Sequence, residues 1–310
     1  MKVAVLCGGV GAARFLSGLL QVVDAADVTA VVNTADDVVL HGLHISPDLD
    51  TVTYTLAGAT DAERGWGLAG ETWQAMEGIR RYGGIDWFNL GDRDLATHMY
   101  RTQRLSEGAT LATITREITR AWGLGLVVLP VTEDRLRTMV TVVDEGEIGF
   151  QEYFVGRQHS VEVTGVRFDG AADATAGPGV LDALHEADVV VIAPSNPIVS
   201  IGPLLAVPGV RDAVVAARSR TVAVSPIVGG AALKGPADRM LRELGHESSV
   251  VGVARLYAPL AATLIIDEAD AGSAEAVEAE GIRCVATSTI MSEPGVAAAL
   301  ARTALSEGAR

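Results

Sequence analysis

The segment KVAVLCGGVGAARFLSGLLQVVDAADVTAVV, residues 2–32, decides the fold. Residues 2–6 form a short, β-branched apolar run, a glycine loop follows, and residues 12–23 carry apolar side chains at helical spacing. Residues 28–32 are almost entirely apolar, which is typical of a parallel strand that is covered on both faces. The segment therefore predicts a strand, a loop, a helix and a second, parallel strand.

The same pattern returns later in the chain, where residues 189–193 and 221–224 predict buried strands that end in polar loops. Between the two regions, the pattern predicts helices at 71–82, 95–104 and 111–122 and paired strands at 139–143 and 147–154. We therefore predict an α/β fold with a doubly wound, mostly parallel, Rossmann-like sheet and an inserted mixed α+β middle region.

No linker or repeat divides the chain, so we expect a single domain over residues 1–310. Its core would comprise about residues 1–60 and 180–310, with the insertion at about 61–179. Ligands of such sheets bind at the carboxyl ends of the strands. The loops after the strands that begin at residues 2, 28, 189 and 221 should therefore face one crevice.

Composition limits the possible partners. The chain has 310 residues, 49% of them hydrophobic, and 39 acidic against 24 basic side chains give a net charge of −15. Such a charge repels nucleic acids and anionic membranes. Two cysteines provide no disulfide framework, and no apolar run approaches the roughly 18 residues of a membrane span. We expect a cytoplasmic protein that binds neither nucleic acid nor membrane.

A glycine loop lies between the first strand and the first helix. Gly8, Gly9 and Gly11 would let the backbone approach a phosphate at the N-terminus of the helix. Arg14 stands where the dinucleotide-binding fingerprint requires a small third residue, and the lysine of an NTPase loop is missing. We interpret the loop as a general phosphate-binding loop, with a tight turn chosen for packing as the alternative.

Carboxylates crowd the stretch after the second strand. Asn33 and Asp36 follow that strand directly, and Asp48 and Asp50 come soon after. Oxygen ligands opposite a phosphate loop suit Mg²⁺. Asp50 is the preferred ligand, whereas Asp48 could equally cap a turn or helix.

Histidines near these carboxylates do not indicate zinc. His41 and His44 lie between the two groups of aspartates, but no third soft ligand has suitable spacing. We interpret both as polar loop residues.

Three further segments could contact a ligand. Arg93 could clamp a phosphate or the polar edge of a ring, with an internal ion pair or a helix cap by Asp92 as the alternative reading of its segment. Ser195 and Asn196 follow the apolar strand at 189–193, where hydroxyl and amide groups can cradle a nucleotide. Lys234 stands in a loop of glycine and proline.

Taken in order, these segments resemble the 2-phospho-L-lactate transferase family and its actinobacterial branch, the phosphoenolpyruvate transferases of coenzyme F420 biosynthesis. The resemblance spans nearly the whole chain, and its most specific segments are SPDLDT and GDRD. It rests on GGVGAARFL (8–16), VVNTADD (31–37), HISPDLDT (44–51), LGDRDLATH (90–98), APSNPIVSIGP (193–203) and VSPIVGG (224–230).

The resemblance implies a magnesium-dependent enzyme whose partners are the deazaflavin Fo and a guanosine diphosphate-linked three-carbon acid. The terminal ribityl hydroxyl of Fo would attack the phosphate that bears the acid, and GMP would leave. The acid would be an enolpyruvyl group, as the actinobacterial style of the sequence favours, or a 2-phospholactyl group. A homodimer is also implied.

The resemblance also assigns residues. Asp50 and Arg93 would contact the deazaflavin, and Asp36 and Asp50 would hold the cation. The 8–11 loop would hold the donor together with Asn33, Ser195 and Asn196. Asp50 is also the candidate catalytic base.

Two other functions fit parts of the sequence. A related family with a similar phosphate loop binds a UDP-sugar and regulates metabolism without catalysis, but the SPDLDT and GDRD segments match the transferases instead. A nicotinamide-dependent oxidoreductase would explain the glycine loop and Asp36, but Arg14 argues against it.

Overall fold

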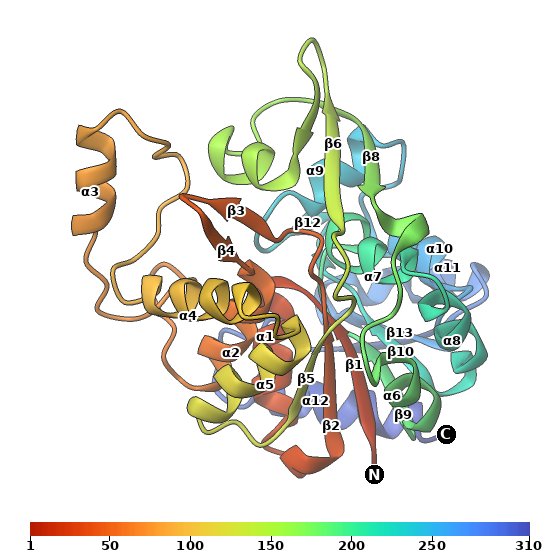
Figure 1. Cartoon of the computed structure of the whole chain (residues 1–310). Coiled ribbons are helices and arrows are strands. Elements are labelled where there is room, and N and C mark those ends of the chain that lie inside the picture. The colour runs from red at the N-terminus through yellow and green to blue at the C-terminus, as the bar shows by residue number, and fades with distance from the viewer.

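The computed structural model describes all residues from Met1 to Arg310 and has a seven-stranded, parallel central sheet (Figure 1). The strand order is β14-β13-β10-β9-β1-β2-β5, and every neighbouring pair is parallel. This architecture confirms the predicted doubly wound α/β fold. The strands are β1 (Val3–Cys7), β2 (Val28–Val32), β5 (Val127–Pro130), β9 (Val189–Ile192), β10 (Thr221–Val224), β13 (Thr263–Asp267) and β14 (Arg283–Thr287).

Helices cover both faces of this sheet, because successive side chains of a strand point to opposite faces. In β1, Val3, Val5 and Cys7 pack into one core, whereas Ala4 and Leu6 pack into the other. The first core includes residues of α1 (Gly9–Leu19), α2 (Pro47–Leu56), α5 (Leu111–Ala121) and α12 (Val296–Gly308). The second includes residues of α6 (Val180–Glu186), α7 (Gly202–Ala206), α8 (Val210–Ala216), α10 (Val250–Tyr257) and α11 (Ala274–Ala279).

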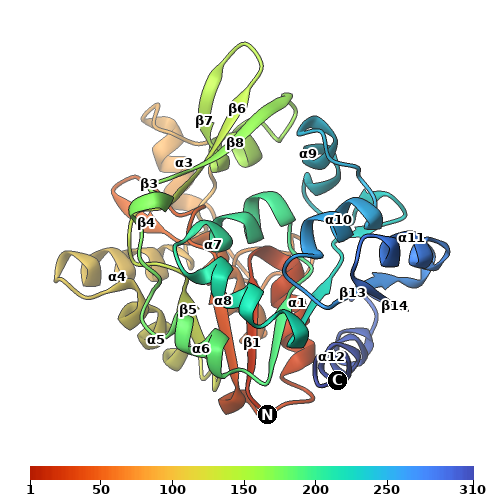
Figure 2. The same ribbon diagram turned by 90° about the vertical axis from the view of Figure 1, so that its right-hand side faces the viewer.

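A second lobe stands above the carboxyl ends of the strands (Figure 2). It is an antiparallel sheet of β6 (Arg137–Val142), β7 (Gly146–Gly149) and β8 (Val163–Asp169), beside α9 (Ala237–Glu243). The predicted strand at 147–154 is wrong beyond Gly149, because residues Glu152–Gly156 form a π-helix, η2. Phe150 and Tyr153 are both buried in the small core of this lobe. Their three-residue spacing suits a helical turn and not a strand.

An arm extends from the other side of the molecule and carries α3 (Gln74–Arg81) (Figure 1). Next to it lie α4 (Leu95–Ser106) and the hairpin of β3 (Val38–Leu40) and β4 (Leu43–Ile45). His41 and Gly42 form the turn of this hairpin with φ angles of 53° and 77°. Positive φ at both central residues is the geometry of a type I′ turn, so His41 is a turn residue as interpreted.

The middle of the chain is interwoven with the core. Residues 61–179 supply α3, α4, α5 and the β6–β8 lobe, but they also supply β5, which pairs with β2 in the central sheet. A short hairpin of β11 (Ile227–Val228) and β12 (Ala231–Ala232) follows β10.

No single helix has the length and hydropathy needed to cross a membrane. The segments Pro197–Ala206 and Val210–Ala216 reach that length and hydropathy only together, and they meet at an angle of 98°. Ile201, Leu204 and Val210 of this pair are buried in the second core, which explains their apolar character.

Candidate functional site

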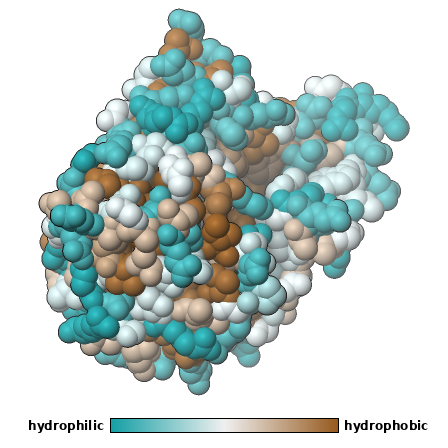
Figure 3. Space-filling view, turned by 180° about the vertical axis from the view of Figure 1, so that it is seen from behind, coloured by the Kyte–Doolittle hydropathy of each residue, from teal (hydrophilic) through white to brown (hydrophobic).

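A cavity of about 700 Å³ lies at the carboxyl ends of the central strands. Its lining includes Gly8–Gly11 after β1, Asp36 after β2, Pro194–Asn196 after β9 and Ser225–Pro226 after β10. This arrangement confirms the prediction that the loops after these four strands face one crevice. Seen from behind, the molecule is hollowed between the β6–β8 lobe and the α3 arm, with hydrophobic side chains inside the hollow (Figure 3).

The glycine loop packs closely against neighbouring residues. A Cβ atom on Gly11 would lie 2.4 Å from the carbonyl oxygen of Pro194, and one on Gly8 would lie 2.9 Å from Oδ2 of Asp48. Gly9 has a φ of 73°, which other residues rarely adopt. The loop therefore packs tightly, as the alternative interpretation holds, and it also lines the cavity.

Ser195 joins the loop after β9 to the glycine loop. Its hydroxyl donates to the carbonyl oxygen of Gly8 over 2.8 Å and accepts from the Gly8 amide over 3.3 Å. Asn196 uses its side-chain oxygen to accept from the amide of Ile198 over 2.9 Å, at the start of the π-helix η4 (Pro197–Ile201). Both predicted residues line the cavity, with much of their hydrogen-bonding capacity used inside the protein.

Asp36 and Asp48 form a buried carboxylate pair that Asn33 bridges. The Asn33 amide donates to Oδ2 of Asp36 over 3.1 Å and to Oδ2 of Asp48 over 3.0 Å. The other oxygen of Asp48 accepts from the amide of Gly9 over 2.8 Å, whereas Oδ1 of Asp36 is buried without a partner. Asp36 lines the cavity as predicted, whereas Asn33 is fully buried behind it and outside the lining. The sequence analysis missed that Asp48 positions the glycine loop.

Burial disfavours the charged form of both carboxyl groups. It raises the pKa of Asp36 well above 3.8, and the neighbouring charge of Asp48 adds to the shift. It also raises the pKa of Asp48 from 3.8 to about 6, although hydrogen bonds from Asn33 and Gly9 oppose the change. Two close, poorly solvated carboxylates with a free oxygen favour the approach of a cation.

This pair gives a pH prediction. Between about pH 4 and pH 6, folded Asp48 retains a proton that the unfolded chain has released, so its contribution to stability falls as the pH rises. Replacing Asp48 by Asn removes this titration. In denaturant unfolding without divalent cations, the wild type should lose on the order of 2–3 kcal/mol relative to Asp48→Asn over that range. A stability difference that stays constant with pH would contradict the raised pKa.

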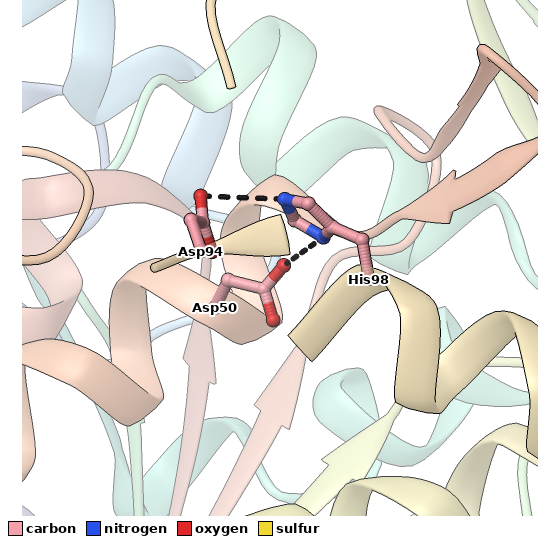
Figure 4. Close-up of side chains that lie close together, drawn as sticks. All are labelled: Asp50, Asp94 and His98. Carbon is pink, nitrogen blue, oxygen red and sulfur yellow. Dashed lines mark ion pairs between the residues drawn. The ribbon is translucent and has the colours of Figure 1, made fainter. Parts of the chain in front are cut away.

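Asp50 belongs to a second cluster, which contains Asp94 and His98 (Figure 4). Nδ1 of His98 lies 3.7 Å from Oδ2 of Asp50, and its Nε2 lies 3.3 Å from Oδ2 of Asp94. The first turn of α2 supplies Asp50, and the start of α4 places Asp94 and His98 opposite it. Ligand atoms of the three side chains all lie within 4.8 Å of one another, so the group could hold a metal ion.

Arg101 fixes the orientation of Asp50. Its two terminal nitrogens donate to the two carboxylate oxygens, one of them over 3.1 Å, and its side chain is only 2% exposed. Burial raises the pKa of Asp50, against the charge of Arg101. Burial also acts on Asp94, but the hydrogen bond and charge of His98 hold the pKa of Asp94 below its usual value. Asp50 is therefore a buried carboxylate held by a fork of two hydrogen bonds.

The sequence contained a signal for this second cluster. His98 and Arg101 lie three residues apart on the predicted helix at 95–104, which places them on one face. The sequence analysis predicted this helix but did not connect either residue with Asp50.

Arg93 lies outside the lining of the cavity. Its side chain is exposed and donates to the carbonyl oxygen of Ala69, and its amide donates to Glu71 over 2.7 Å. The neighbouring Asp92 accepts from the amides of Gln74 and Ala75, at the start of α3. Asp92 therefore caps a helix, as the alternative interpretation of this segment supposed. The helix that it caps is α3, and not α4, which follows it in the sequence.

Aromatic side chains line another part of the cavity. Phe150 and Phe154 stack with their ring centroids 5.5 Å apart and their planes at 9°. The other aromatic residues of the lining are Tyr54, Trp66, Trp87 and Phe88. The cavity therefore combines a polar region of backbone amides and carboxylates with an aromatic region that suits a flat ring.

Comparisons with known proteins agree with the resemblance in the sequence. The model of the family described as 2-phospho-L-lactate transferase CofD matches residues 3–303. The phosphoenolpyruvate transferase of Streptomyces griseus is 48% identical over 98% of each chain. That of Mycolicibacterium smegmatis is 42% identical, again over 98% of each chain. Protein BH3568 of Bacillus halodurans, at 16% identity, shares the fold with a TM-score of 0.64 over 98% of this chain and 99% of its own.

Proposed function

This chain belongs to the 2-phospho-L-lactate transferase CofD family of enzymes, and we propose that it transfers a phosphoenolpyruvyl group to the deazaflavin Fo. The donor is a guanosine diphosphate-linked enolpyruvyl group, the second product is GMP, and the reaction is a step of coenzyme F420 biosynthesis. The observation that supports this most is the cavity itself, because one space joins a glycine loop, acidic clusters and an aromatic wall.

The donor occupies the polar region. Its diphosphate lies along Gly8–Gly11, at the start of α1, and beside Ser195 and Asn196. Asn33 supports this region from behind, through its hydrogen bonds to Asp36 and Asp48. Amides at the start of a helix favour bound anions. The names of the relatives favour the enolpyruvyl over the 2-phospholactyl group.

The acceptor occupies the aromatic region. The tricyclic ring of Fo packs against Phe150, Phe154 and Trp87, while its ribityl chain reaches toward Asp50. Arg93 contacts the ring edge only if its side chain leaves Ala69, so this contact requires a rearrangement of the 69–71 segment.

A divalent cation, Mg²⁺, fits the donor set of the cavity. Asp36 offers a buried carboxylate oxygen without a partner, and Asp50 keeps lone pairs beyond its hydrogen bonds to Arg101. Asp94 and His98 are further ligand-type groups next to Asp50. We propose Asp36 and Asp50 as the protein ligands. When bound, the cation neutralises charge on the phosphates inside a protein of net charge −15.

The reaction requires positioning and one proton transfer. The terminal ribityl oxygen of Fo attacks the phosphorus that carries the enolpyruvyl group, and an oxygen–phosphorus bond forms. The bond from this phosphorus to the bridging oxygen of the diphosphate breaks, and GMP leaves. The proton of the hydroxyl group passes to the carboxylate of Asp50, which Arg101 holds in place. No covalent enzyme intermediate is needed.

Binding of Fo tests the acceptor assignment before any turnover. Fo fluorescence should be quenched when the protein is added, because stacking on aromatic side chains brings the ring close to Trp87. Phe154→Ala should weaken this binding by about tenfold or more, whereas Tyr100→Ala, which removes an exposed ring outside the cavity, should not. Equal quenching by wild type and Phe154→Ala would place the deazaflavin elsewhere.

Two further properties complete the proposal. We propose that the enzyme is a homodimer and that it acts in the cytoplasm, where its buried thiol Cys7 stays reduced. Sedimentation analysis at micromolar concentration measures the first property directly.

A further inference from the structure

Some of the charged side chains around the cavity have a partner within the protein, and others have none. Its lining contains the carboxylates Asp36, Asp48, Asp50 and Asp94 and the cationic residues Arg14, Arg64 and Lys234. Arg64 forms an ion pair with Asp61 over 3.1 Å and lies over the rings of Trp66 and Trp73. Arg14 and Lys234 have no ion pair and no side-chain hydrogen bond within the protein. The cavity thus contains two cationic side chains that are not paired with any carboxylate of the protein.

Arg14 is the better placed of these two cations. Gly11, Val10 and Arg14 are three and four residues apart in α1, so they share one face of the helix, and all three line the cavity. Arg14 therefore lies on the same helix face as two residues of the glycine loop. Lys234, in contrast, is exposed on a loop, with its ammonium beside Gly65.

The surroundings of Arg14 also indicate an anion. No acidic residue lies in the first turn of α1, and no side chain caps this helix at Gly8. The amides of Gly8 and Gly9 donate to Ser195 and Asp48, and neither of these contacts involves Arg14. A half-buried guanidinium offers several N–H donors in a planar fork that matches phosphate oxygens. Because this fork has no partner within the protein and lines the cavity, a bound anion can take that place.

We propose that Arg14 binds the diphosphate of the nucleotide and thereby discriminates a nucleoside diphosphate from the uncharged nucleoside. This inference rests on the proposed function, because it assumes that the polar region of the cavity is the donor site. The residue that departs from the dinucleotide-binding fingerprint is then a phosphate ligand in its own right.

A nucleotide series tests the role of Arg14. The affinities of guanosine, GMP and GDP are measured by calorimetry at fixed Mg²⁺ for the wild type, Arg14→Gln, Arg14→Lys and Arg302→Gln. Arg302 is an exposed, unpaired arginine of α12 outside the cavity, so its variant matches the change in charge. Arg14→Gln should weaken GDP binding at least about tenfold, or about 1.4 kcal/mol, and leave guanosine binding unchanged. Arg14→Lys should be intermediate, and Arg302→Gln should match the wild type.

Three results would overturn the assignment. One is a ratio of GDP to guanosine affinity that Arg14→Gln leaves unchanged, and another is an equal loss of affinity for both ligands. The third is wild-type protein that binds GDP no more tightly than guanosine. Arg14 has no partner within the protein, so its variants should also keep the wild-type melting temperature, which a structural role would lower.

Uridine and UDP separate this proposal from the proposed function. A preference for UDP over GDP would contradict the guanosine-linked donor. The role of Arg14 would then be decided by the ratio of UDP to uridine affinity, which Arg14→Gln should lower.

Discussion

Asp50→Asn is expected to lower the rate of group transfer at least about 100-fold, or roughly 2.7 kcal/mol of transition-state stabilisation. The asparagine keeps the size of the side chain but can neither accept the proton of the ribityl hydroxyl nor carry charge toward a cation. Steady-state turnover with saturating donor and Fo measures the effect. Asp36→Asn should reduce turnover similarly if its free oxygen binds the cation.

The control for this experiment is Asp37→Asn. Asp37 lies next to Asp36 and accepts from Ser46 over 2.7 Å, but it does not line the cavity. Its variant should retain most of the turnover, and Asp48→Asn should lose much less than Asp50→Asn. Near-normal turnover of Asp50→Asn and Asp36→Asn, with an unchanged dependence on Mg²⁺, would contradict the proposed roles of both residues.

Arg101→Met should cause the largest loss of stability. It removes the cation that neutralises Asp50 and leaves a carboxylate buried without its partner. Breaking a buried ion pair in this way costs about 3–5 kcal/mol. Denaturant unfolding at pH 7.5 measures the difference in the free energy of unfolding. Arg104→Met, which breaks surface pairs with Glu107 and Glu117, should destabilise the protein far less than Arg101→Met.

A double variant separates the lost ion pair from lost packing. Arg101→Met combined with Asp50→Asn removes both charges, so it should be more stable than Arg101→Met alone by about 1 kcal/mol or more. If the double variant lost as much unfolding free energy as the two single variants together, the charges of Arg101 and Asp50 would not stabilise each other.

Patterns local in sequence predicted the fold well. The mostly apolar runs predicted β2 and β10 with their observed bounds, and the glycine loop was placed correctly between β1 and α1. The error at 147–154 arose because Phe150 and Tyr153 pack into a core made partly by distant α9. Likewise, the pairing of β5 with β2 joins segments about 100 residues apart, and no local pattern indicates it.

The candidate site divides in a similar way. The predicted strands showed which loops meet at the cavity, because the carboxyl ends of parallel strands lie at one edge of the sheet. The partner of each carboxylate depends on side-chain geometry across elements. Asn33 therefore bridges Asp36 and Asp48, and Arg101 holds Asp50, in arrangements that spacing alone does not reveal.

The enzyme is expected to transfer the enolpyruvyl-bearing phosphate from its guanosine diphosphate-linked donor to Fo. The bond between the two phosphates of the donor breaks in this transfer. Liquid chromatography of a reaction containing the protein, Mg²⁺, Fo and the guanosine diphosphate-linked donor tests it directly. The account predicts that GMP appears in equal amounts with a new deazaflavin carrying the phosphoenolpyruvyl group, and that neither forms without Mg²⁺. Unchanged Fo, with the donor intact or merely hydrolysed, would contradict it.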